Sequence, residues 1–127
     1  MGASEMDDEI DFETDSFSDI VAKDPRYNAR AYALLMDVIN YLVDELEAKH
    51  IDAEFILDEF RERTLDQYGP LSYTVLTEWG VERCEDIGEM MFNLVESKRV
   101  NKDQSDSPEA FVGRYDFKEA FKGPYEV

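Results

Sequence analysis

Apolar side chains recur at spacings of three and four residues along most of the chain, which is the pattern of amphipathic helices. The longest run predicts a helix over residues 24–49, which begins at Asp24-Pro25, an acidic cap followed by a proline in the first turn. This helix is apolar over more than half of its girth. We therefore expect it to be central to the core or shared with a second subunit, which would be a homodimer through residues 24–49.

Three shorter helices are predicted downstream, over residues 53–68, 70–79 and 85–97. Asp52 is a suitable cap for the first of them, and Gly69 suits the left-handed position that follows a helix. Gly80 ends the second helix. Gly88 lies inside the third, where a glycine costs up to about 1 kcal/mol relative to alanine, so we expect close packing there against a neighbouring helix or aromatic ring.

The pattern changes after residue 98. Residues 103–109 are rich in Asp, Ser and Pro, which predicts a loop, and residues 100–102 and 112–117 are predicted to pair across it as a small β-hairpin. Helices, a tight turn and a hairpin in this order resemble half of a winged helix, a fold that often binds nucleic acid. Five aromatic residues near the C-terminus are expected to lay the tail over the helical core: Phe111, Tyr115, Phe117, Phe121 and Tyr125.

These elements predict a mainly α protein, a single compact helical domain of about four helices with a winged-helix-like hairpin and an aromatic C-terminal tail. A chain of 127 residues has room for one domain, which we expect over residues 24–127. Residues 1–23 are predicted to form an acidic, disordered arm. The reason is that residues 1–22 hold eight acids and neither lysine nor arginine.

The charge balance narrows the choice of partners. The chain carries 31 acids against 13 lysines and arginines, a formal net charge of −18. Such a protein is repelled by phosphate backbones and anionic membranes and is attracted to basic proteins. The charge could also serve solubility alone. We expect a small protein-interaction or regulatory module that binds a basic protein or protein complex, with no membrane binding.

The candidate contact residues lie on and just before the predicted helix over residues 85–97: Glu82, Glu85, Asp86, Glu89 and Glu96. Recognition helices that read nucleic acid need cations and hydrogen-bond donors, and these carboxylates argue against that role. The alternative hypothesis is a winged-helix-like, nucleic-acid-associated protein. Its contacts would come from the basic residues that follow: Lys98, Arg99, Lys102 and Arg114.

The sequence offers little to catalysis or to metal binding. His50, the single histidine, is expected to interact with helix-end carbonyls, and no nucleophile motif accompanies it, so no enzymatic activity is predicted. Residues 103–106 lack the mid-loop glycine and the terminal glutamate of a calcium loop. No cofactor and no metal is therefore expected. Trp79, Met90 and Met91 could form a peptide groove, but at helical spacing such residues more often belong to a core.

Cys84 is the single cysteine, which excludes a disulfide within the chain and fits a reducing cytoplasm. The N-terminus lacks the basic and apolar regions of a signal peptide. No apolar stretch approaches the roughly 20 residues that cross a bilayer. We therefore expect a cytoplasmic protein.

Several short motifs, spread over about residues 25–121, carry a resemblance to a known family: Tyr27 with Ala31-Tyr32, His50-Ile51, Gly69-Pro70, Val75-Leu76, Trp79-Gly80-Val81, Asp86-Ile87-Gly88-Glu89, Phe92 with Leu94-Val95-Glu96, Asp106-Ser107, Tyr115-Asp116-Phe117 and Ala120-Phe121. On these residues the chain resembles an uncharacterised family of small acidic bacterial proteins, seen mostly in planctomycete and verrucomicrobial genomes. That family has no assigned activity, so the resemblance implies a shared fold and no function. Cys84 stands where the family pattern has threonine, so we expect the helix after it to be capped differently.

Overall fold

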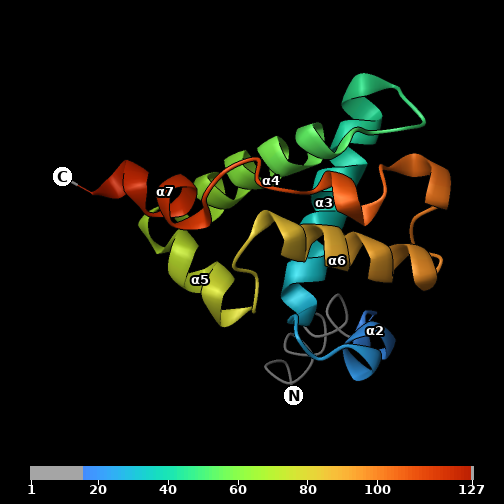
Figure 1. Cartoon of the computed structure of the whole chain (residues 1–127), viewed down its shortest axis with the longest axis horizontal. Coiled ribbons are helices and arrows are strands. Elements are labelled where there is room, and N and C mark those ends of the chain that lie inside the picture. The colour runs from blue at the N-terminus through green and yellow to red at the C-terminus, as the bar shows by residue number, and fades with distance from the viewer. Residues whose placement is uncertain (1–15, 127) are drawn as a thin grey trace, which may run out of the picture.

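Residues 16–126 are described by the computed structural model, and they fold mainly as α-helices (Figure 1). The α-helices are α2 (Ser18–Lys23), α3 (Ala29–Leu46), α4 (Ala53–Tyr68), α5 (Ser72–Glu78), α6 (Cys84–Glu96) and α7 (Phe117–Phe121). Short 3-10 turns join or follow them: η1 (Gly69–Leu71), η2 (Lys102–Gln104), η3 (Pro108–Ala110) and η4 (Gly123–Tyr125). The predicted mainly α fold is confirmed, and none of these helices is both long and apolar enough to cross a membrane.

Helix α3 lies at the centre of the fold, where it crosses α4 and α6 (Figure 1). Its apolar face is buried within the chain itself: Ala31, Tyr32, Leu34, Leu35, Val38, Ile39 and Leu42. Tyr41 and Leu46 are the large apolar side chains of α3 that remain exposed. The wide apolar face that the sequence assigned to the core or to a second subunit is thus covered by other parts of the same chain.

The start of α3 differs from the prediction. The helix begins at Ala29, and Asn28 caps it by accepting a hydrogen bond from the Arg30 backbone N–H at 2.8 Å. Asp24 does not cap this helix but ends α2, and its carboxylate accepts hydrogen bonds from Arg26 Nε at 2.9 Å and Nη2 at 2.7 Å. The carboxylate is engaged by the guanidinium, so the capping role moves to Asn28.

The boundary of the acidic arm also differs, because residues 16–23 belong to the folded part. Phe17 and Ile20 are buried, and the ring of Phe17 stacks on Tyr32 with the ring centroids 5.9 Å apart. Arg99 secures this segment by donating to the carboxylate of Asp19 at 2.7 and 3.1 Å. The part of the arm prediction that concerns residues 1–15 lies outside the described residues.

A tight turn at Gly80 fixes α5 and α6 against the start of α3. Gly80 has a φ of +87°, and a Cβ on this residue would overlap the carbonyl oxygen of Arg26. The Trp79 carbonyl accepts a hydrogen bond from Asn28 N–H at 3.0 Å in the same turn. Only glycine combines this left-handed backbone with such a close approach of two chain segments.

Gly88 marks the second close approach, as predicted. A Cβ on this residue would lie 2.9 Å from Phe111 Cβ and 2.9 Å from the Pro108 carbonyl oxygen. The turn η3 therefore rests directly on α6, and the aromatic ring expected beside Gly88 is that of Phe111. This contact brings residues 101–110 back alongside α6.

The predicted hairpin does not form, and with it the winged-helix interpretation loses its support. Residues 100–102 and 112–117 do not pair as strands, and the single β-bridge recorded in residues 16–126 joins Ile51 to Ser105. The segment is instead held by short-range bonds, from Gln104 N–H to the Asn101 carbonyl and from Phe111 N–H to the Pro108 carbonyl. The second stretch leads directly into α7, because the Asp116 side chain caps this helix by accepting a hydrogen bond from Glu119 N–H at 3.0 Å.

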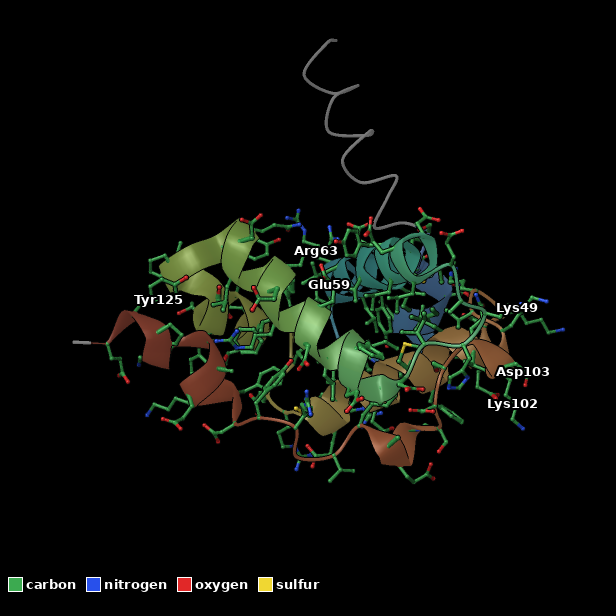
Figure 2. The ribbon with its side chains drawn as sticks, turned by 90° about the horizontal axis from the view of Figure 1, so that it is seen from above. Lys49, Glu59, Arg63, Lys102, Asp103 and Tyr125 are labelled. Carbon is green, nitrogen blue, oxygen red and sulfur yellow. The ribbon has the colours of Figure 1, made fainter. Side chains whose placement is uncertain are left out.

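The aromatic tail covers one end of the helical core, as expected. Phe111, Phe117 and Phe121 are buried, and the half-buried Tyr115 donates its hydroxyl proton to the Leu57 carbonyl at 2.7 Å. Tyr125 is the exception, since its side chain remains exposed. Figure 2 shows Tyr125 at one end of the molecule and Lys102 and Asp103 at the other.

Candidate interaction site

The outer face of α6 joins carboxylates and one aromatic side chain in a single stripe. Glu85, Glu89, Phe92 and Glu96 follow one another at spacings of four, three and four residues, so they lie along one side of the helix. Phe92 is 48% exposed, although it stands in the middle of the helix. The opposite side of α6 is buried in the core through Ile87, Met90, Met91 and Leu94. We call Glu85, Glu89, Phe92 and Glu96 the α6 stripe.

Asp86, one of the predicted contact residues, has a structural role. Its carboxylate accepts hydrogen bonds from the backbone N–H groups of Glu82 and Arg83, at 2.9 and 3.1 Å, and from the hydroxyl of buried Tyr27 at 2.7 Å. It thus satisfies N–H groups at the start of α6 and ties this helix to the start of α3. The capping role that the sequence left open at Cys84 falls to this aspartate.

The other predicted carboxylates remain at the surface. Glu82, Glu89 and Glu96 are exposed, and Glu85 is half-buried. Glu89 lies 3.3 Å from Arg26 Nη2, whereas no ion pair joins Glu85 or Glu96 to any residue between positions 16 and 126. Glu82 lies just before α6 in the chain, and the α6 stripe carries an excess of negative charge.

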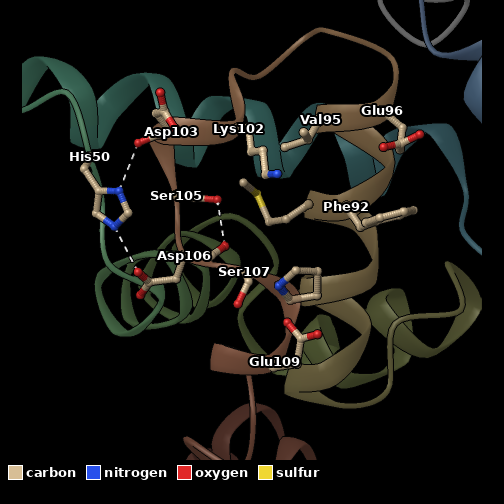
Figure 3. Close-up of a pocket in the computed structure, with 12 residues that line it drawn as sticks. His50, Phe92, Val95, Glu96, Lys102, Asp103, Ser105, Asp106, Ser107 and Glu109 are labelled. Atoms are coloured by element: carbon tan, nitrogen blue, oxygen red, sulfur yellow. Dashed lines mark hydrogen bonds and ion pairs between the residues drawn. The ribbon is translucent and has the colours of Figure 1, made fainter.

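A groove with a volume of about 780 Å³ runs beside the C-terminal half of α6 (Figure 3). Its apolar lining comes from Met91, Phe92, Val95 and Pro108. Its charged lining comes from Glu96, Asp103, Asp106, Glu109, Lys102 and His50. We call it the α6 groove. One wall is helix α6 and the other is the segment over residues 102–109, so the segment predicted as a loop forms one side of the groove.

His50 fastens this second wall to the start of α4. Its Nδ1 lies 2.9 Å from the Asp103 carbonyl oxygen, and its Nε2 lies 2.9 Å from a carboxylate oxygen of Asp106 (Figure 3). Asp106 in turn accepts a hydrogen bond from Ala53 N–H at 2.9 Å, which caps α4 in place of the predicted Asp52 side chain. The Ile51 N–H donates to the Gln104 carbonyl at 2.8 Å. We call this arrangement the His50 clasp.

The clasp shifts the acid–base equilibria of both side chains. Hydrogen bonding to the Asp103 carbonyl, and then to Asp106, raises the pKa of His50 above its usual value. The hydrogen bond from Ala53 N–H, followed by that from His50, lowers the pKa of Asp106. His50 thus interacts with carbonyl and carboxylate oxygens of a distant segment, and not with the end of its own helix.

Among the described residues, His50, Asp52 and Asp106 offer nitrogen and carboxylate ligand atoms that all lie within 4.8 Å of one another. Such a set could hold a divalent cation through one nitrogen and two oxygen ligands. The contacts of His50 Nε2 with Asp106 at 2.9 Å and with Asp52 at 3.5 Å account for the same geometry. The site also lies at the N-terminus of α4, where the helix dipole disfavours a cation.

The four basic candidates do not converge on one surface. Arg99 is held by Asp19 near α2, while Arg114 lies 2.7 Å from a carboxylate oxygen of Asp58 and 3.7 Å from Glu54 on α4. Lys98 is exposed after α6, and Lys102 lines the α6 groove. Two of the four positive charges are therefore balanced by local carboxylates. The patch that direct nucleic-acid binding would require is not formed by these residues.

Cys84 lies at the start of α6 and is buried. Burial raises the pKa of its thiol, and the sulfur lies 3.4 Å from the Tyr115 carbonyl oxygen. A thiol with a raised pKa and no access to solvent is a poor nucleophile. Met90 and Met91 belong to the core, as expected, although Met91 also lines the floor of the α6 groove.

Sequence reasoning missed two features of this site. The first is Phe92, which lies on the outer side of α6 among three glutamates. Helical spacing alone could have placed it there. The His50 clasp carries no comparable signal, because its two halves lie more than 50 positions apart in the chain. A scan against protein-family models and searches of curated proteins and of solved structures find no match to this chain.

Proposed function

We propose that this protein is a small acidic interaction module that binds a basic protein through the outer face of α6. The observation that carries the proposal is the α6 stripe, in which exposed Phe92 stands between glutamates one turn before and one turn after it. Large aromatic side chains on a surface often act as anchors for a partner. Carboxylates around such an anchor favour a partner that presents lysine or arginine.

The charges of the folded part support this choice of partner. Residues 16–126 contain 24 acids and 13 lysines and arginines. Five of the arginines are paired with carboxylates of the chain itself: Arg26, Arg61, Arg63, Arg99 and Arg114. The remaining surface is therefore dominated by carboxylates that are free to attract a cationic partner, and such attraction raises the rate of association.

The charges in the last turns of the main helices also support a basic partner. Helices α3, α4 and α6 carry no basic residue in their last turn, although a cation there would interact favourably with the helix dipole. Helix α6 ends instead with Glu96, and α3 has Asp44 and Glu45 near its end. Each such acid forgoes about 0.3–1 kcal/mol of stability. The last turns of α3 and α6 therefore add negative charge to the surface, which favours a basic partner.

The proposal is tested by affinity capture from the protein's own cell lysate, at low and at high salt and with nuclease treatment. The variant is Phe92→Ala, and Phe55→Ala is the matched control, because Phe55 on α4 is 46% exposed and lies outside the stripe and the α6 groove. We expect one basic protein that the native chain and Phe55→Ala retain at low salt and that Phe92→Ala loses, with circular dichroism unchanged.

Three outcomes would overturn the proposal. Equal retention by Phe92→Ala would show that the α6 stripe is not the contact. Capture that disappears after nuclease treatment would assign binding to nucleic acid. Retention that does not weaken at high salt would show that the carboxylates play no part, because attraction between exposed charges is screened by salt.

A further inference from the structure

We infer that the α6 groove receives one apolar side chain from a lysine- or arginine-rich segment of the basic partner, whose cations lie against the acidic rim. This inference rests on the proposed function and specifies the chemistry of the partner at the same face of α6. The α6 stripe and the α6 groove are continuous, since Phe92 and Glu96 belong to both.

The interior of the groove suits an apolar side chain. Met91 forms a buried floor, Val95 is half-buried, and Phe92 and Pro108 border the opening. The volume of about 780 Å³ exceeds that of one side chain and lies in the range of binding pockets. A side chain placed here would lose its contact with water, as would the exposed ring of Phe92, and that loss favours binding.

The rim of the groove selects the charge of the occupant. Glu96, Asp103 and Glu109 are exposed and have no ion-pair partner among the described residues, whereas Lys102 is the single lysine or arginine of the lining. Figure 3 shows Lys102 extending from the wall opposite α6. The carboxylates outnumber the cations, so a positively charged segment fits and a phosphate does not.

The same charge argues against occupants from the protein itself. Residues 1–15 contain seven acids and no lysine or arginine, so they are repelled by the rim. A second copy of the chain brings a further net charge of −18 to the contact. The occupant must therefore come from a different, basic protein.

Both walls of the groove are formed before any ligand binds. Helix α6 is fixed by its buried face, and the segment over residues 102–109 is held by the His50 clasp at one end and by the packing of Phe111 on Gly88 at the other. A preformed groove avoids the entropy loss of ordering a loop on binding. A short segment can then bind without rearrangement of the fold.

The test uses two fluorescent lysine-rich peptides that differ at one central position, leucine in one and serine in the other. Fluorescence anisotropy of the full chain at low salt should give a dissociation constant about tenfold lower for the leucine peptide, from burial of its side chain. Val95→Lys fills the groove and should abolish the preference for leucine. Ser107→Lys, at an exposed position on the rim, is a second variant that should abolish this preference. Thr74→Lys on α5 is the control, and it should retain the preference for leucine.

Lys102→Ala should increase the affinity for the leucine peptide, whereas the two lysine substitutions in the groove should decrease it. Removing this cation should strengthen binding of the leucine peptide about twofold to fivefold, because it removes a repulsion at the rim. Weaker binding after Lys102→Ala would overturn the inference.

Two further outcomes separate the inference from the proposed function. Equal affinity of the leucine and serine peptides, or a preference that survives Val95→Lys and Ser107→Lys, would overturn the groove as the anchor site and leave the acidic interaction module standing. Failure of both peptides to bind at low salt would overturn the attraction to basic partners itself.

Discussion

His50 Nε2 lies 2.9 Å from a carboxylate oxygen of Asp106, a residue 56 positions further along the chain. The other ring nitrogen faces the Asp103 carbonyl at the same distance. A carbonyl and an ionised carboxylate only accept hydrogen bonds, so both contacts are satisfied together when the imidazole carries two protons and a positive charge. The geometry of the clasp therefore couples the second wall of the α6 groove to the protonation of a single histidine.

This coupling predicts a pH dependence of stability. The folded pKa of His50 is raised, so its contribution is complete below the unfolded value of about 6.5 and is lost as the pH rises through the folded value. The folded pKa of Asp106 is lowered, so its contribution is present above about 3.9 and is lost as the pH falls through the folded value. The clasp should stabilise the protein most between about pH 4 and about pH 6.5.

The measurement is urea unfolding of the native chain and of His50→Gln at about pH 5.5 and about pH 8.5. The difference in unfolding free energy between the two proteins should be larger at the lower pH. Other carboxylates titrate equally in both proteins and cancel in this difference. A difference that is the same at both pH values would show that the imidazolium form does not hold the clasp.

A second prediction concerns Gly88. In an exposed helix, replacing glycine by alanine stabilises by about 1 kcal/mol, but the new methyl group would here meet Phe111 Cβ and the Pro108 carbonyl oxygen. Overpacking of this kind costs about 1–3 kcal/mol, so Gly88→Ala should lower the unfolding free energy. The control is Gly123→Ala, because no atom lies within 4 Å of a Cβ at that position. A stabilised Gly88→Ala protein would contradict the packing of η3 on α6.

A third prediction separates two neighbouring acids on α6. Asp86→Ala removes the acceptor of two backbone N–H groups and of the Tyr27 hydroxyl, and should cost roughly 1–3 kcal/mol. Glu85→Ala, at the adjacent position on the α6 stripe, should change the unfolding free energy by less than about 0.5 kcal/mol. Equal losses in denaturant unfolding would show that Asp86 is an ordinary surface carboxylate.

A fourth prediction concerns the accessibility of Cys84. Its thiol is buried and its pKa is raised, so Ellman's reagent should label the native protein at least about tenfold more slowly than the urea-unfolded protein. Tyr115→Ala should increase the native rate, because the Tyr115 hydroxyl anchors to Leu57 the segment whose backbone carbonyl contacts the thiol. Fast labelling of the native chain would show that the start of α6 opens readily.

The helices were the most predictable part of this protein. The helix predicted over residues 53–68 matches α4, and that predicted over residues 85–97 matches α6 to within a residue at each end. Apolar periodicity and the glycines that end or pack helices act within a few positions of the chain, so the sequence carries them directly. The predicted cap of α3 was wrong by four residues, at Asp24 instead of Asn28, and Arg26 engages the carboxylate of Asp24 that would have served as the cap.

The candidate site was predictable only in part. Glu85, Glu89 and Glu96 lie on the same side of α6 as Phe92, as their spacing indicates, and Glu82 is exposed just before the helix. Asp86 could not be separated from them, because its hydrogen bond to Tyr27 joins positions 59 apart. The engagement of two of the basic candidates was not predictable either, because Arg99 pairs with Asp19 on α2 and Arg114 with Asp58 on α4, both far away in the sequence.

By itself, the sequence of this protein determined its helical class, the extents of two of its main helices, its acidic surface and the close approach at Gly88. Each of these follows from the nature of a residue and of its near neighbours. The tertiary structure alone decided the groove. Residues 100–117 contain strand-like stretches that could have paired with each other, but groups at residues 50–53 bond to residues 103, 104 and 106 between those stretches and hold this segment against the start of α4. Which partner satisfies a backbone group depends on what the rest of the fold brings within hydrogen-bonding distance, and local sequence does not contain that information.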